Sequence, residues 1–211
     1  MAIRSKVLLI LSVLFTLIQF ETALAQSLPV RSRISDVNLA GCPVGATAAI
    51  TEDGLSMSLL FDHFAVSQKN RFSNCSVELI FDVPKNKKIS INKIQTRGFI
   101  SLENKKTMAQ LNIETWMGPS YDWGDASYGK IDELFRGPIS KELNIVREVQ
   151  PDDLKYTLCS TAPLERMSGA IKVNLSLGNS NASDQFSIDS IDGAYIEFFF
   201  EDADCDGHDG A

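Results

Sequence analysis

Residues 75–83, CSVELIFDV, decide the fold of this chain because apolar and polar side chains alternate along them. Every odd-numbered residue of the stretch is apolar, and most of the even-numbered ones are polar or charged. Successive side chains of a β-strand point to opposite faces, so this period of two predicts a strand with one face in the core and one in water. The same alternation recurs in residues 55–59, 89–91, 108–113, 170–177 and 186–191.

Short clusters of glycine, proline, asparagine and aspartate separate these segments and predict turns. About ten short strands with tight connections predict an all-β fold in which two antiparallel sheets pack face to face, a β-sandwich. A closed β-barrel is the alternative arrangement of the same strands. We expect one sandwich domain over residues 41–205, preceded by an N-terminal segment over 26–40 and followed by an acidic tail over 206–211.

The alternating pattern is weaker in several places. Gly98 interrupts an extended stretch, where we expect a β-bulge or a strand break. Residues 125–135 could form one short helix capped by Asp125, and residues 140–149 fit either a strand or a helix. The basic run KNKK at residues 85–88 lies between two apolar stretches and predicts a solvated hairpin turn.

The N-terminus, residues 1–25, has the pattern of a secretory signal peptide. Basic residues are followed by an apolar run over 7–20 and by the small-x-small sequence ALA at 23–25. We therefore expect the mature chain to begin at Gln26 and the protein to be exported, either secreted or periplasmic. At about 14 residues the apolar run is too short to span a bilayer as a helix, and no second run follows, so no membrane span is expected.

The expected mature chain is acidic. The whole sequence has 20 Lys and Arg, 27 Asp and Glu, and a net charge of −7. Removing residues 1–25 takes away two basic residues and one acidic residue, which leaves 18 basic and 26 acidic residues and a net charge of −8. Phosphate binding relies on a basic surface that this chain lacks overall, so we expect no nucleic-acid partner.

All four cysteines, Cys42, Cys75, Cys159 and Cys205, lie in the expected mature chain. An even number of cysteines in an oxidising compartment predicts two disulfides, for which three connectivities are possible. Pairing Cys42 with Cys75 and Cys159 with Cys205 closes a moderate loop in each half of the chain, and we expect this connectivity. Zinc is not expected, because the sequence has no C-x-x-C motif and only two histidines.

Near the C-terminus, Asp202, Asp204 and Asp206 form the pattern D-x-D-x-D-G, with which calcium-binding loops begin. Position 12 of such a loop normally supplies a bidentate glutamate, but the sequence ends at position 10, Ala211. Residues 195–200 also predict a strand where an EF-hand has a helix. We expect a solvated acidic terminus, with a weak structural calcium site as the alternative and no other cofactor.

Both tryptophans and two of the four tyrosines fall within residues 116–128, which also contain Gly, Ser and Pro. Aromatic rings on such a loop give a large contact area at low entropic cost, as partner-binding and sugar-stacking surfaces do. We therefore name Trp116, Tyr121, Asp122 and Trp123 as candidate ligand-binding residues. The alternative is that the loop folds back and its rings cover the end of the core.

Catalytic motifs are not evident. The sequence has no G-x-S-x-G pentapeptide, and a catalytic triad would have to use one of only two histidines. Acidic residues are so numerous that a pair of carboxylates facing one groove is expected by chance and does not predict a glycosidase. We expect a non-enzymatic binding or envelope-associated module whose partner is a carbohydrate or a cell-envelope protein. The alternative is an extracellular hydrolase acting on polysaccharide.

A set of short motifs occurs in a recognisable order. These are GCPVG at residues 41–45, LSMSLLFDHF at 55–64, NCSVEL at 74–79, RGF at 97–99 and SIDS at 187–190. Their order and the four cysteines resemble those of the secreted proteins grouped as domain of unknown function 4360. The resemblance covers residues 41–205 and implies a small secreted all-β protein. It implies no activity, and the acidic residues after Cys205 depart from the family pattern.

Overall fold

The computed structural model describes residues 31–118, 129–151, 154–188 and 194–205. The predicted signal peptide, the candidate residues Tyr121, Asp122 and Trp123, and Asp206 with the rest of the acidic tail lie outside these ranges. Among the residues that are described, none belongs to a helix long and apolar enough to cross a membrane.

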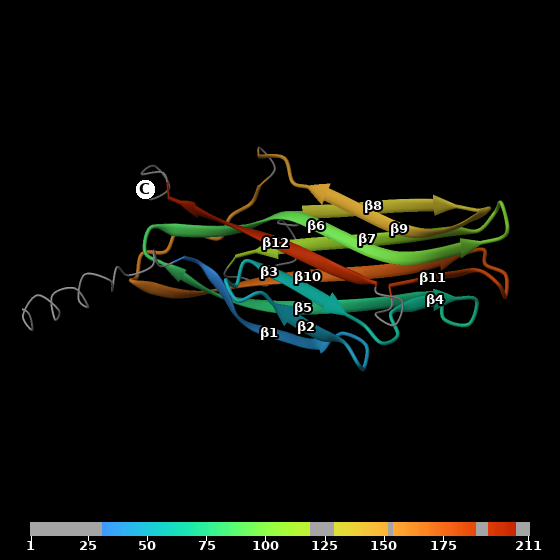
Figure 1. Cartoon of the computed structure of the whole chain (residues 1–211), viewed down its shortest axis with the longest axis horizontal. Helices are drawn as coiled ribbons and strands as arrows, with labels where there is room; N and C mark the ends of the chain where they lie inside the picture. The colour runs from blue at the N-terminus through green and yellow to red at the C-terminus, as the bar shows by residue number, and fades with distance from the viewer. Residues whose placement is uncertain (1–30, 119–128, 152–153, 189–193, 206–211) are drawn as a thin grey trace, which may run out of the picture. The chain divides into compact units, whose positions relative to one another are not determined.

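Two antiparallel sheets form a β-sandwich (Figure 1), as the alternation predicts, and the sheets do not close into a barrel. Strand order in the five-stranded sheet is β1-β5-β10-β7-β8, and in the seven-stranded sheet it is β2-β3-β12-β6-β11-β4, with β9 also paired to β6. The strands are β1 Arg33–Gly41, β2 Thr47–Ile50, β3 Ser56–Leu60, β4 Ala65–Ser67, β5 Phe72–Pro84, β6 Lys87–Leu102, β7 Met108–Met117, β8 Gly129–Arg136, β9 Ile139–Glu148, β10 Leu164–Gly178, β11 Gln185–Ser187 and β12 Tyr195–Asp204.

The predicted alternation in β5 is confirmed. Its odd-numbered residues from 75 to 83 are at most 1% exposed, and they pack in the core between the two sheets. The longest strands lie in the middle of the sheets: β10 pairs with β5 and β7, and β6 pairs with β12, β11 and β9.

Strand β6 continues through Gly98, where we predicted a bulge or a break. One edge of β6 pairs with β12 as far as Arg97 and with β11 from Phe99 onward. Gly98 lies where the partner changes, and a Cβ there would be 2.5 Å from the carbonyl oxygen of Ser187. The irregularity in β6 falls instead at Asn92, opposite the junction of Phe199 and Phe200.

Two other expectations differ from the structure, and one open alternative is decided. Strand β1 occupies most of the segment before residue 41, so the sandwich extends N-terminally beyond the predicted boundary. The predicted helix at 125–135 is wrong over residues 129–135, which belong to β8 and pair with β7. Pairing overrides the helical propensity of this segment, because alternate residues from Ile131 onward face inward. The ambiguous stretch at 140–149 is strand β9 as far as Glu148.

Residues 85–86 of the basic run form a turn, and Lys87 and Lys88 begin β6. The turn joins β5 of one sheet to β6 of the other rather than two strands of one hairpin. Its Asn86 adopts a left-handed backbone conformation, with φ 61°. The Asn86 amide donates to the carbonyl of Ser160, and its carbonyl accepts from the amide of Cys205. The turn therefore fastens two distant segments instead of lying free in solvent.

The two disulfides have the predicted connectivity, Cys42–Cys75 and Cys159–Cys205. The first joins the end of β1 to β5 within the five-stranded sheet. The second joins the end of β12 to the segment between β9 and β10. Each bond closes a loop within one half of the chain.

A buried carboxylate, Asp184, organises the end of the sandwich where β6 turns into β7. It is 1% exposed and accepts hydrogen bonds from the amides of Glu103 and Asn181 and from Thr107 Oγ1, at 2.7, 2.6 and 2.7 Å. Burial acts to raise the pKa of Asp184, but the hydrogen bonds to Asn181, Thr107 and Glu103 outweigh it, and the pKa is lowered. Asp184 thus holds the β6–β7 turn against the β10–β11 connection.

We expect Asp184→Asn to lower the free energy of unfolding by about 3 kcal/mol at neutral pH. The substitution replaces one acceptor oxygen by an NH₂ group, which then faces the N–H and O–H donors that bonded to that oxygen. The matched control is Asp53→Asn in an exposed turn, with an expected loss below about 1 kcal/mol. Because the pKa of Asp184 is lower in the folded than in the unfolded chain, its ionised form stabilises the fold fully above the unfolded pKa of about 3.9. This stabilisation is lost as the pH falls through the pKa of the folded state. Urea unfolding should therefore show the Asp184→Asn deficit shrinking at acidic pH, and an unchanged deficit would contradict this role.

Candidate functional site

Strand β12 supplies a row of functional side chains to the outer face of the seven-stranded sheet. Its residues Ile196, Phe198 and Phe200 are at most 5% exposed and lie in the core. Because side chains alternate along a strand, Glu197 between them and its outward neighbours point away from the core. These outward residues are Tyr195, Glu197, Phe199 and Glu201.

Neighbouring strands extend this row sideways. The register places Ser56 of β3 and Lys93 of β6 on either side of Phe199, and Glu148 of β9 beyond Lys93. Side chains directly opposite each other on one face of a sheet lie close enough to interact. Four strands, β3, β12, β6 and β9, therefore build one continuous polar and aromatic surface.

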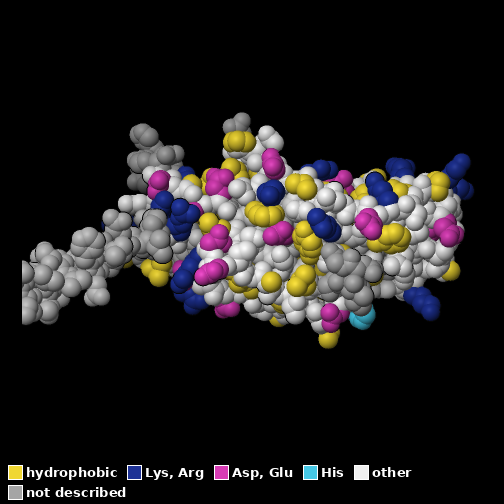
Figure 2. Space-filling model, in the orientation of Figure 1, with side chains coloured by type: hydrophobic (Ala, Val, Ile, Leu, Met, Phe, Trp, Pro, Cys, Tyr) yellow, Lys and Arg dark blue, Asp and Glu magenta, His cyan; other side chains and the backbone are white. Residues whose placement is uncertain are grey.

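An open groove of about 770 Å³ lies over this surface. The β3 side contributes Asp53 and Ser56, and the segment after β9 closes the other side with Pro151 and Leu154. Figure 2 shows acidic, basic and hydrophobic side chains interspersed over the face of the molecule that it displays. Acidic residues predominate among the described residues that line the groove: Asp53, Glu148, Glu197 and Glu201 are accompanied by one cation, Lys93.

Hydrogen bonds hold the groove carboxylates Glu197 and Glu201 in place. Ser56 Oγ donates to Glu197 Oε1 at 2.9 Å, and Asn92 Nδ2 donates to Glu201 Oε2 at 3.4 Å. The Tyr156 hydroxyl donates to the other oxygen of Glu201. Burial, together with this hydrogen bond and the charge of Glu201, raises the pKa of Tyr156 to about 12, so its hydroxyl stays protonated as a donor at neutral pH.

Tyr156 reaches Glu201 because its segment runs along the edge of β6 beyond the end of β9. The amides of Val149, Thr157 and Ser160 donate to the carbonyls of Asn92, Ile89 and Lys87, at 2.8, 2.9 and 3.0 Å. The Cys159–Cys205 disulfide ties the same segment to the end of β12. Backbone pairing and a covalent bond thus fix the residue that orients Glu201.

Aromatic rings of this face already hold cations. The ammonium of Lys93 lies 3.7 Å from the centroid of the Phe199 ring, and the guanidinium of Arg97 lies 5.3 Å from that of Tyr195. Ring faces attract cations through their quadrupole at such distances. Phe199 therefore gives the groove floor a face suited to a positive group.

Of the four candidate residues of the predicted aromatic site, Trp116 lies in a described range, and it does not line this groove. Trp116 lies near the end of β7 and is 8% exposed, so it offers little ring surface for stacking. Two residues after it, the amide of Gly118 donates to the carbonyl of Ser168, and Ser168 Oγ donates to the Gly118 carbonyl. Tyr121, Asp122 and Trp123 are outside the described ranges and stay a prediction.

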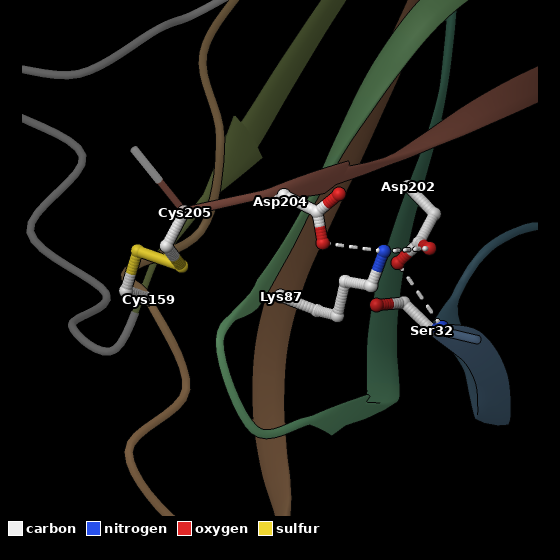
Figure 3. A network of polar contacts seen from close by, with 6 residues as sticks. All are labelled: Ser32, Lys87, Cys159, Asp202, Asp204 and Cys205. Atoms are coloured by element: carbon white, nitrogen blue, oxygen red, sulfur yellow. Dashed lines mark hydrogen bonds and ion pairs between the residues drawn. A yellow bond between two sulfur atoms is a disulfide. The ribbon is translucent and has the colours of Figure 1, made fainter. Parts of the chain in front are cut away.

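The predicted calcium ligands Asp202 and Asp204 lie at the end of β12 and contact a lysine (Figure 3). Lys87 Nζ is 2.8 Å from Asp204 Oδ1 and 3.5 Å from Asp202 Oδ2. Asp202 Oδ1 also accepts a hydrogen bond from the amide of Ser32 at 3.2 Å. Asp204 pairs with Lys87 in the strand register, so the spacing of two residues places both carboxylates beside one ammonium.

We call this arrangement of Ser32, Lys87, Asp202 and Asp204 the C-terminal clasp. Within the described ranges, no three or more His, Cys, Asp and Glu side chains are grouped as metal ligands would be. Asp206 is outside those ranges, so the calcium site stays a prediction. The clasp could have been foreseen from charge complementarity between the basic run at 85–88 and the acidic residues at 201–204.

Comparison with protein families gives a match over residues 31–202 to the model described as "Domain of unknown function (DUF4360)". The chain belongs to this family. The match confirms the resemblance seen in the sequence motifs and adds β1 to the family domain. No curated protein matches this DUF4360 chain.

Three solved structures are similar to the DUF4360 chain at low TM-scores. TmCBM61 in complex with β-1,4-galactotriose is 13% identical over 80% of this chain and 90% of its own, with a TM-score of 0.20. The CBM22-1 xylan-binding domain from Paenibacillus barcinonensis Xyn10C is 12% identical over 85% and 100%, with a TM-score of 0.16. A structure of infectious bursal disease virus Gx strain is 11% identical over 86% and 34%, with a TM-score of 0.28. At such scores these similarities support no inference about the DUF4360 groove.

We expect Lys87→Met to lower the free energy of unfolding by about 2 kcal/mol, between the cost of breaking a buried ion pair and that of a surface pair. The reason is that the Asp202 side chain, 9% exposed, loses its cation, whereas Asp204 at 82% stays hydrated. Lys85→Met in the turn just before Lys87 is the control, because Lys85 is exposed. Equal unfolding midpoints for the two variants in guanidinium chloride would contradict the clasp.

Proposed function

We propose that this chain is an exported, non-catalytic binding module that holds a carbohydrate in the groove on the outer face of its seven-stranded sheet. The observation that carries the proposal is the outward row on β12, in which the Phe199 ring lies between the Glu197 and Glu201 carboxylates. A sugar presents an apolar C–H face and a rim of hydroxyl donors, and a ring between two acceptors complements both. Ligand sites combine apolar surface with a few placed polar groups in this way.

Preorganisation supports this function. Ser56 fixes Glu197, and Tyr156 with Asn92 fixes Glu201, so little side-chain freedom remains to be lost on binding. The groove also lies on strands rather than loops, and a rigid floor positions its groups accurately. Export is supported by the two disulfides, which persist in oxidising compartments, and by the predicted signal peptide.

The described contacts favour binding over hydrolysis. Glu197 accepts a hydrogen bond from Ser56, and Glu201 accepts from Asn92 and Tyr156, so both carboxylates serve as ordered acceptors. The sequence also has no catalytic motif. We therefore place the hydrolase alternative second and assign neither glutamate a catalytic role.

Isothermal titration of the exported chain, residues 26–211, against a panel of oligosaccharides tests the proposal. We expect Phe199→Ala to weaken binding of any glycan ligand about tenfold or more, as truncation of a central contact does. Phe72→Ala is the matched control, because Phe72 is 55% exposed at the start of β5 and does not line the groove. Binding that Phe199→Ala leaves unchanged, or a panel without any ligand, would refute this function.

A further inference from the structure

The groove presents hydrogen-bond acceptors in excess of donors. Its carboxylates belong to Asp53, Glu148, Glu197 and Glu201. Among the described residues that line it, both hydroxyl groups already donate to these carboxylates: Ser56 Oγ donates to Glu197, and Thr51 Oγ1 donates to Asp53 at 2.6 Å. Asn92 Nδ2 donates to Glu201, which leaves the side chains of Lys93 and Gln150 as further donors against four carboxylates. A ligand that fits this surface must therefore bring donors of its own.

Asn92 lines the same groove and orients one of its carboxylates. Its Nδ2 donates to Glu201 at 3.4 Å, and its Oδ1 is buried without a hydrogen-bond partner among the described residues. Because Oδ1 is buried, Asn92 acts here through Glu201 and not as an acceptor for a ligand.

The position of Lys93 shows where a positive group is accommodated. Its ammonium lies over the Phe199 ring at 3.7 Å, on the strand between those of Glu148 and Phe199. Lys93 comes from the protein itself, and its flexible stem allows the ammonium to move aside. A ligand ammonium could take the same place over the ring while facing a groove that carries four carboxylates.

We propose that the ligand of this groove is a glycan bearing free amino groups, whose ammonium groups lie over Phe199 and between Glu197 and Glu201. This inference rests on the proposed function and specifies the class of carbohydrate. An ammonium has three donors and no acceptor, so it matches both the charge and the hydrogen-bond inventory of the groove. An acetylated amino sugar keeps the ring and the hydroxyls but loses the charge.

A basic peptide fits the groove less well than an amino-sugar chain. The groove floor is the face of a sheet, where the strands use their backbone N–H and C=O groups to pair with one another. Extended peptides are commonly recognised through main-chain hydrogen bonds at a sheet edge. The floor therefore offers its side chains, and a chain of rings carrying hydroxyl and amino groups engages these better.

The test compares a tetramer of glucosamine with its N-acetylated counterpart by isothermal titration of the exported chain. At about 50 mM salt we expect the glucosamine tetramer to bind at least about tenfold more tightly, and at about 500 mM this preference should shrink because salt screens exposed charges. Equal binding, or tighter binding of the acetylated tetramer, would overturn the amine preference and leave a neutral-glycan site. Failure of every glycan would instead refute the proposed function.

Variants locate the effect in the groove. We expect Glu197→Gln with Glu201→Gln to abolish the preference for glucosamine, and a preserved preference would place the amine elsewhere. Lys93→Met removes the competing ammonium and should tighten glucosamine binding several-fold, whereas Lys141→Met, on β9 outside the groove, should not. Weaker binding by Lys93→Met, or equally tight binding of tetralysine to the wild type, would contradict the proposal.

Discussion

Burial of Ile196, Phe198 and Phe200 between the sheets fixes the direction of every other side chain of β12. With a side-chain period of two, a shift of β12 by one residue would put Glu197 and Glu201 into the core and expose three large apolar groups. The cost of that exchange allows only one register. The polar groove is therefore a consequence of how the core is packed.

The end of β12 secures the same register by other means. Asp202 and Asp204 contact Lys87, and the backbone of Cys205 bonds to the turn before β6. The disulfide from Cys205 then holds the segment that carries Tyr156, whose hydroxyl orients Glu201. The core residues, the clasp, the disulfide and the groove residues are thus all connected through β12 and the strands and segments beside it. A residue pattern that resembles a calcium loop takes part in ordering a surface some distance along the strand.

Local patterns in the sequence predicted much of the fold but not the groove. Alternation is a short-range signal, and it identified the sandwich, while cysteine number and spacing led to the observed disulfides. The groove combines Ser56, Lys93, Glu148 and Phe199, which are far apart in the chain and meet only through strand register. Register depends on pairing across both sheets, and no short window of sequence contains it. The same pairing made residues 129–135 a strand despite their helical propensity.

The central claim is that the outer row of β12 is the binding surface. Backbone amide chemical shifts of the isotope-labelled exported chain, titrated with a glucosamine tetramer, test it most directly. The account predicts that the largest shift changes fall in residues 195–201 and 92–95, with smaller ones in 146–149 across the groove. Largest changes around Trp116 and Gly118 on the other sheet, or no changes at any concentration, would contradict it.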